Sequence, residues 1–387
     1  MLGKKNGKSI IVLISTLKGL SEHMRSIIWQ PFALSLGISM SSLGGLESTY
    51  DLVKNLTQPF FGSGSDSLGR KRFLILREIL FIVSMLLFIF AHTPVFLFLG
   101  IGLLSLSYAV EPVWYTFVAE ISDRASLASA YSLVYASYMG IGLIAPMMAG
   151  MLASSFGFSS VYALSAFFGV VSLLVSAKMI AETKNREASA KVTIIKFMQS
   201  LKESVKPDKE LRRFYLSMAL DGISFGIGSR ILYGMLTKSH GYDLYMISLL
   251  ATSMTVSWAI VQIPLGKLID RVGYKSSLII SQILSSVYIG ALLLTQSFWM
   301  VLIFQALFGI AAALWAPAEQ SWIASKVEPS KRGAYIGNYL AFKGFISFPA
   351  PFVGGVLFDS FGFFAPLFVN LVGAVIDILL LSILLRR

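Results

Sequence analysis

Cysteine is absent from this chain of 387 residues, and charged residues are scarce at 13%. The lack of cysteine excludes a disulfide framework and any site built on thiolate ligands. Soluble globular chains contain about 25% charged residues, so the shortage of charge excludes that class. The chain also lacks a Walker loop, a nucleophile triad and a cluster of metal-ligand residues. We therefore predict no enzyme activity, no metal and no cofactor.

Apolar residues take up the space instead, at 56% of the chain and a mean hydropathy of +0.74. They gather in twelve segments of roughly the 20 residues that cross a bilayer as a helix. The segments lie near 9–35, 42–62, 73–92, 95–119, 128–153, 158–181, 213–237, 244–265, 276–296, 298–323, 333–357 and 363–385. This pattern predicts an all-α membrane protein with twelve transmembrane helices. The expected domains are an N-terminal bundle (1–181), a basic cytosolic linker (182–212) and a C-terminal bundle (213–387).

The loops between these segments differ sharply in charge. Those on the same side as the N-terminus carry clusters such as 70–72 and most of the lysines of the linker, whereas the other side carries essentially Lys238. Because cytosolic loops retain Lys and Arg, we expect both termini in the cytosol and a multi-pass protein of the cell membrane. The net charge of +12 has the same explanation. We expect the lipid bilayer around a monomer, and no nucleic-acid partner.

The two halves of the chain repeat each other. Asp66 and Asp270 are separated by 204 residues (270 − 66), and Pro112 and Pro317 by 205 (317 − 112). The segment APMMAG (145–150) matches APFVGG (350–355) at the same spacing. An offset held to one residue across most of each half indicates an internal duplication, which is common among transporters.

The loop after the second segment reads QPFFGSGSDSLGRKR (58–72), and the loop after the eighth reads QIPLGKLIDRVGYKS (262–276). Both resemble the G-x-x-x-D-[RK]-x-G-R-[RK]-[RK] motif of the major facilitator superfamily, with Ser67 and Tyr274 as departures. The run GIGLIAPMMAG resembles the antiporter motif of that family. The resemblance implies two pseudo-symmetric six-helix bundles and secondary transport. The motif residues are Gly62, Asp66, Gly69 and Arg70, and Gly266, Asp270, Arg271 and Gly273.

These loop residues are expected to form a conformational latch. Gly62 and Gly69 would permit a tight turn and a close helix approach. Asp66 would face the start of the eleventh segment, where a helix N-terminus favours negative charge. Arg70 would pair with Glu120 or Asp123. The alternative is a loop that is basic only because it is cytosolic.

Ionisable residues at membrane depth usually face a bundle interior or a watery cavity. The stretch TLKGLSEHMRSIIWQPF (16–32) holds four of them. Lys18, Glu22 and Arg25 are spaced i, i+4, i+7 and so share one helical face. The resemblance implies that the first, fourth, seventh and tenth helices line the central cavity. The cavity candidates are Lys18, Glu22, His23, Arg25, Glu111, Trp114, Asp221, Arg230, Trp315 and Glu319.

Three roles for charged groups follow from this arrangement, each with an alternative. Arg25 and Arg230, 205 residues apart, are expected to clamp an anionic group, to pair with neighbouring acids, or to extend toward the outer lipid headgroups. Asp51 and Lys343 would form a gate between the halves, unless Asp51 pairs with Lys54 on its own helix. The candidates for proton coupling are Glu22, Glu111, Asp51 and Asp221, each of which fits a permanent ion pair equally well.

The predicted function is secondary active transport of a small organic molecule by alternating access. Proton-coupled efflux is favoured by the antiporter-like segment and the loop motif. The alternative is an uptake or exchange carrier for an anionic metabolite, a carboxylate or phosphate, because the cavity segments also carry several cations. Trp114 and Trp315 would stack on a flat substrate, or serve packing alone.

Overall fold

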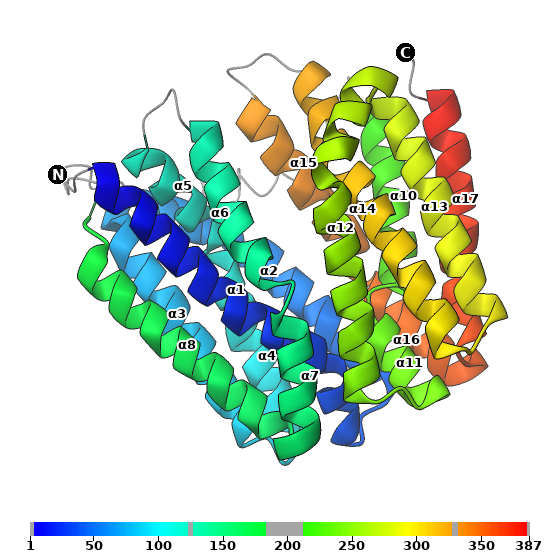
Figure 1. Cartoon of the computed structure of the whole chain (residues 1–387), viewed down its shortest axis with the longest axis horizontal. Helices are drawn as coiled ribbons and strands as arrows, with labels where there is room; N and C mark the ends of the chain where they lie inside the picture. The colour runs from blue at the N-terminus through cyan, green and yellow to red at the C-terminus, as the bar shows by residue number, and fades with distance from the viewer. Residues whose placement is uncertain (1–3, 123–126, 183–211, 327–331, 385–387) are drawn as a thin grey trace. The chain divides into compact units, whose positions relative to one another are not determined.

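The computed structural model of the protein describes residues 4–122, 127–182, 212–326 and 332–384. All regular secondary structure in these ranges is α-helical (Figure 1). The prediction of an all-α chain is confirmed. Each of the twelve expected segments coincides with one helix or with two consecutive helices.

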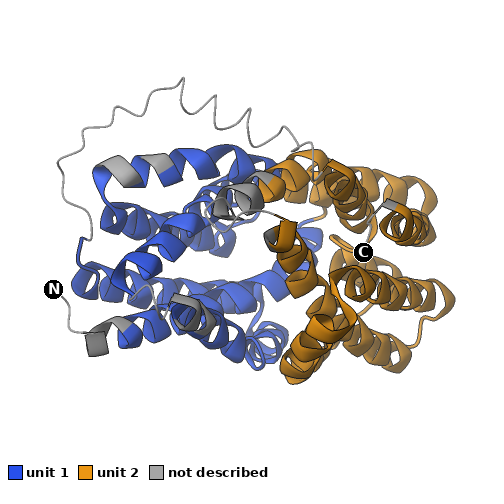
Figure 2. Ribbon diagram, turned by 90° about the horizontal axis from the view of Figure 1, so that it is seen from above, with its two compact units in different colours: residues 1–36, 49–201 blue, residues 37–48, 202–387 orange. Residues whose placement is uncertain are grey.

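The chain divides into two compact units (Figure 2). Unit 1 comprises residues 1–36 and 49–201, and unit 2 comprises residues 37–48 and 202–387. The helices of the first half are α1 (Lys4–Ser35), α2 (Met40–Leu68), α3 (Arg70–Ile89), α4 (Pro94–Ala109), α5 (Glu111–Ile121), α6 (Leu127–Ile141), α7 (Ala145–Phe156) and α8 (Phe158–Met179). Those of the second half are α10 (Arg212–Gly228), α11 (Leu232–His240), α12 (Leu244–Val272), α13 (Tyr274–Leu294), α14 (Phe298–Lys326), α15 (Arg332–Ser347), α16 (Ala350–Phe361) and α17 (Phe364–Leu384).

Eight stretches of the described chain are long and apolar enough to cross a membrane. They begin with the α4–α5 pair and end with α17. The remaining expected segments share one feature: α1, α2, α3 and the α10–α11 pair each carry several charged residues. The count of twelve spans therefore stays a prediction for these four. The predicted linker falls almost wholly outside the described residues.

Four expected segments are broken into two helices, and three of the breaks lie next to proline. Pro112, Pro146 and Pro351 each occupy the first turn of the second helix of their pair. Proline suits that position, because the first turn of a helix needs no N–H for an internal hydrogen bond. Pro146 and Pro351 are repeat-equivalent, so both halves break at the same place. Pro317, the counterpart of Pro112, instead lies inside the continuous helix α14.

The start of α2 belongs to unit 2, although the predicted boundaries place it in the first bundle. The side chain of Asp359, at the end of α16, accepts hydrogen bonds from the backbone N–H groups of Met40 (3.2 Å) and Ser41 (2.7 Å). Gly44 lies against the carbonyl of Pro351 with no room for a side chain. Small residues at such contacts let helix backbones approach closely, which is how membrane helices associate.

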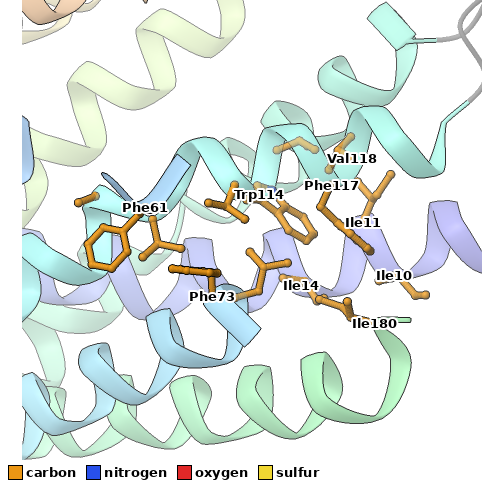
Figure 3. Close-up of a cluster of buried hydrophobic side chains, with 14 residues drawn as sticks. Ile10, Ile11, Ile14, Phe61, Phe73, Trp114, Phe117, Val118 and Ile180 are labelled. Atoms are coloured by element: carbon orange, nitrogen blue, oxygen red, sulfur yellow. The ribbon is translucent and has the colours of Figure 1, made fainter. Parts of the chain in front are cut away.

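Unit 1 has an apolar core formed by α1, α3 and α5 together with residues from α2 and the end of α8 (Figure 3). Trp114 lies in this core with 2% of its surface exposed and stacks on Phe117 at 5.9 Å between ring centroids. We expected Trp114 to line a cavity. Its ring packs in this core, which fits the packing alternative, and the cavity role stays a prediction.

Candidate functional site

Unit 1 contains a buried cluster of charges around Arg77 on α3, which we call the Arg77 cluster (Glu22, Arg77, Glu78 and Tyr138). One guanidinium nitrogen of Arg77 donates to Glu22 Oε1, and another donates to Glu78 Oε1 at 2.6 Å. The Tyr138 hydroxyl donates to Glu22 Oε2 at 2.8 Å. The three charged side chains are at most 4% exposed. Buried charges survive only when paired and hydrogen-bonded, and this cluster meets both conditions.

The other predicted cavity residues of unit 1 surround this cluster. Lys18 is 4% exposed, and its Nζ lies 5.5 Å from the ring centroid of Trp114. Arg25 is also buried, with its guanidinium 5.9 Å from the ring of Tyr108. The His23 ring lies 4.8 Å from that of Tyr138. Glu111 begins α5 close enough to Lys18 and Arg77 to interact with both electrostatically. The polar face predicted for the first helix thus lies inside its bundle.

Unit 2 contains a second cluster, the Lys343 cluster (Asp221, Glu319, Tyr339 and Lys343). Lys343 Nζ on α15 donates to Asp221 Oδ2 at 3.1 Å and to Glu319 Oε1 at 2.9 Å. The Tyr339 hydroxyl donates to Glu319 Oε1 as well. The ring of Trp315 lies 5.7 Å from Lys343 Nζ. One ammonium group is therefore held by two carboxylates and faces an indole.

A chain of hydrogen bonds extends from this cluster to α17. Gln282 Nε2 on α13 donates to Asp221 Oδ1 and to Asp377 Oδ2, both at 2.8 Å. The Ser217 hydroxyl donates to the other oxygen of Asp377. Asp377 has no exposed surface and Gln282 is 4% exposed. Three helices of unit 2, α10, α13 and α17, are thus joined through polar side chains in its interior.

A cavity of about 340 Å³ lies in unit 2 beside the Lys343 cluster. Its walls come from α10, α12, α13, α14, α15 and α17. The aromatic part of the wall includes Phe225, Trp258, Phe308 and Trp315. The charged part consists of Asp221, Glu319 and Lys343. Aromatic walls with a few convergent polar groups are typical of sites for small organic molecules.

The model of the Major Facilitator Superfamily matches residues 11–211 and 214–387, which is nearly the whole chain. The chain belongs to this family. Members of the superfamily are transporters, so the chain is a membrane transporter of small molecules and not an enzyme. Its resemblance to the family, argued above from the loop motif, is confirmed.

Two curated relatives are multidrug resistance proteins. Multidrug resistance protein 2 of Bacillus subtilis is 24% identical over 338 residues, which cover 85% of this chain and 82% of the relative. Multidrug resistance protein MdtG of Salmonella arizonae is 23% identical over 315 residues, covering 81% and 77%.

Solved structures support the fold. A mutant of the nucleoside transporter NupG matches with a TM-score of 0.79 at 14% identity, over 97% of this chain and 98% of that one. The human organic anion transporter MFSD10 matches with a TM-score of 0.69 at 16% identity, over 98% of this chain and all of that one. At these identities the likeness shows the fold alone.

The two clusters of this transporter occupy equivalent places in its repeat. Arg77 and Gln282 are 205 residues apart (282 − 77), and so are Tyr138 and Lys343 (343 − 138). In unit 1, Glu22 on α1 accepts one hydrogen bond from Arg77 on α3 and one from Tyr138 on α6. In unit 2, Asp221 on α10 accepts one from Gln282 on α13 and one from Lys343 on α15. The cation of this arrangement lies on α3 in unit 1 and on α15 in unit 2. The donor positions are repeated, and the charged and neutral donors exchange places. The two carboxylates are not repeat-equivalent, because Glu22 and Asp221 are 199 residues apart (221 − 22).

The pairings of the remaining charged candidates match the alternatives considered above. Arg230 Nε lies 3.3 Å from Glu47 Oε2, within unit 2. Asp51 Oδ1 lies 3.6 Å from Lys54 Nζ, within unit 1. The clamp between Arg25 and Arg230 and the gate between Asp51 and Lys343 stay predictions. Lys343 is held by Asp221 and Glu319 in this structure, so a gate would require it to leave them.

The first copy of the loop motif shows one of the predicted contacts. Arg70 Nη2 pairs with Glu120 Oε1 at 3.1 Å, as expected. Gly69 has a φ of +96°, which a glycine adopts freely, and it ends α2 in a sharp turn. Gly62 lies inside α2 with open space beside it, and the close approach expected there stays a prediction. The side chain of Asp66 lies outside what the structure describes.

The second copy of the motif is more exposed. Gly273 has a φ of +86° and precedes α13, as Gly69 precedes α3. Asp270 and Arg271 lie on the surface, and Gly266 has open space beside it. The latch role of both copies stays a prediction.

Sequence analysis missed seven members of the polar networks: Arg77, Glu78, Tyr138, Ser217, Gln282, Tyr339 and Asp377. For the three charged residues the signal was present, since LILREIL (74–80) and VIDILLL (375–381) place charges within apolar runs. The same test identified Lys18 and Glu22. Apart from Ser217, the missed residues lie outside the first, fourth, seventh and tenth helices, on which the family resemblance places the cavity.

Proposed function

We propose that this protein exports a small organic molecule from the cell in exchange for protons, by alternating access. Membership of the family supports transport, and the names of two relatives support efflux of foreign compounds. The observation that carries the proposal is the cavity of unit 2. It combines indole and phenyl walls with a buried ion-paired cluster, which suits a flat molecule with at least one polar group.

The charge of the cavity wall supports the choice of substrate. Asp221 and Glu319 together carry two negative charges against the one positive charge of Lys343. The remaining negative charge favours cationic or neutral substrates over anions. The alternative of anion uptake rested partly on Arg230 and Lys343, and both are ion-paired with acids in the structure. We therefore favour export, and organic anions become one arm of the test.

Trp315 offers the sharpest test of the cavity. The full chain would be reconstituted into proteoliposomes, and a pH gradient would be imposed with either ethidium, an aromatic cation, or salicylate, an organic anion, as the substrate. Removing a stacking ring costs about 0.5–2 kcal/mol, or roughly 2- to 30-fold in affinity. We expect the Trp315→Ala variant to weaken ethidium transport by such a factor.

The matched control is Trp299→Ala on the same helix, because the Trp299 ring is 68% exposed and does not line the cavity. Equal transport by both variants would reject the cavity as the substrate site. Transport of salicylate but not ethidium would replace export of a cation by the anion alternative. An equal rate of transport with and without the pH gradient would reject proton coupling.

A further inference from the structure

We propose that Asp377, buried on α17 outside the cavity wall, holds the proton of the transport cycle, and that Gln282 links this proton to Asp221 and Lys343. The role of the proton rests on the proposed export function. Its position on Asp377 rests on the packing of unit 2 alone. The two parts are therefore tested by separate measurements.

The partners of the carboxyl groups single out Asp377. In the Arg77 cluster, Arg77 neutralises both Glu22 and Glu78. In the Lys343 cluster, Lys343 binds both Asp221 and Glu319. The hydrogen-bond partners of Asp377 are instead the neutral side chains of Ser217 and Gln282. Among these clustered acids, only Asp377 lacks a cation as its direct partner in the described structure.

Burial makes this difference decisive. Asp377 has no exposed surface, and a carboxylate removed from water without a cation partner costs several kcal/mol. A protonated carboxyl avoids most of that cost, because a hydrogen-bonded neutral group is tolerated in a protein interior. Ser217 accommodates the proton, since a hydroxyl both donates and accepts. A helical serine can then turn its own hydrogen to the carbonyl one turn earlier.

The charged groups on the neighbouring helices are compatible with a protonated acid. Helices α10, α13 and α16 pack against α17. Asp221 on α10 repels a negative charge on Asp377. Lys343 on α15 attracts it, but Lys343 is already ion-paired with Asp221 and Glu319. From α13, Lys275 donates to the Ser382 carbonyl. From α16, Asp359 is bound by Lys238 and by the start of α2.

Gln282 supplies the connection to the cavity. Its amide nitrogen has two hydrogens, and the two donate to Asp221 and to Asp377 at 2.8 Å each. Loss of the proton would place a second carboxylate on the same amide and add a negative charge near Lys343. Lys343 and Asp221 line the cavity, whereas Asp377 does not. The proton would thus alter how firmly the cavity holds Lys343 without occupying the substrate site.

The first experiment looks for the proton directly. Infrared spectra of the full chain in lipid would be compared for wild type and Asp377→Asn, because a protonated carboxyl has a C=O stretch that a carboxylate lacks. The control is Asp243→Asn, an exposed helix cap where asparagine serves equally well. We expect the variant at 377, and not the control, to lose a protonated-carboxyl band. Unchanged spectra at every pH tested would overturn the proposal.

The second experiment asks whether the proton is used. In proteoliposomes, we expect Asp377→Asn to retain substrate exchange without a pH gradient and to lose at least tenfold of gradient-driven transport. Gln282→Leu cuts the link and also changes one residue of the cavity wall. It should keep the infrared band, and its gradient-driven transport should fall further than its own exchange without a gradient. Full gradient-driven transport by Asp377→Asn would overturn the proposal, as would its failure to fold, because an amide closely matches a protonated acid. If the wild-type protein shows no transport driven by the pH gradient, the proposed export function is rejected. The infrared band of the protonated carboxyl group would still test whether Asp377 holds a proton.

Discussion

Replacing Arg77 by the residue at its repeat-equivalent position tests whether the clusters are held together by paired charge. In Arg77→Gln, Glu22 and Glu78 lose their shared cation while they remain at most 4% exposed. Removing one partner of a buried ion pair costs about 3–5 kcal/mol. At about 2–4 °C per kcal/mol for units of this size, the thermal midpoint should fall by roughly 6–20 °C. Midpoints would be measured on the detergent-purified chain by the loss of its monodisperse size-exclusion peak.

Combined variants of the Arg77 cluster test the same explanation. Adding Glu22→Gln and Glu78→Gln to Arg77→Gln removes the stranded carboxylates, and most of the lost stability should return, because a neutral hydrogen-bonded cluster carries no unpaired charge. Arg213→Gln, an exposed change of the same type, is the control and should shift the midpoint little. If Arg77→Gln behaves like Arg213→Gln, or if the triple variant is no more stable than the single one, paired charge is not what holds the cluster.

Two other predictions concern the loop motif and the predicted gate. Gly69→Ala should lose about 1–3 kcal/mol of stability, since it forces alanine into a φ that favours glycine and drives its Cβ into the Glu182 carboxylate. Thermal midpoints would be compared with those of Gly102→Ala, where a Cβ would meet open space. Equal midpoints for the two variants would contradict this prediction. For the gate, Asp51→Lys and Lys343→Asp should each abolish transport and together restore it; a double variant as inactive as the single ones would remove the gate from consideration.

Much of the fold could be predicted from sequence, because the length of an apolar segment and the spacing of a repeat can both be counted along the chain. Twelve apolar segments gave helices in the expected places, and the proline-containing repeats at 146 and 351 gave breaks in both halves. Arg70 was expected to pair with Glu120 or Asp123, because both acids follow at the end of the fourth segment on the side of the membrane where the loop lies; the pair with Glu120 is present. Such features depend on neighbours in the chain or on a spacing that can be counted.

The partners of the buried charges depend instead on which helices meet, and a single sequence does not contain that information. Lys343 was paired with Asp51 from the family resemblance and from similar depth, and the structure adds two partners that were not foreseen, acids on α10 and α14. Asp377 and Gln282 were overlooked because the helix bundle, and not periodicity, brings them together. Trp114 resembled a cavity residue in its position along the fourth segment, but its packing against Phe117 is a tertiary property.

The bond between Asp359 and the start of α2 has a consequence for the order in which the molecule is built. The carboxylate that receives the Ser41 N–H is encoded 318 residues later. At about 5–20 residues per second, a ribosome needs roughly 15–65 s to add that length. Until then the first N–H groups of this helix have no partner from α16 and must be hydrated. Assembly therefore finishes where the second helix begins, and a chain truncated before α16 would leave that end frayed.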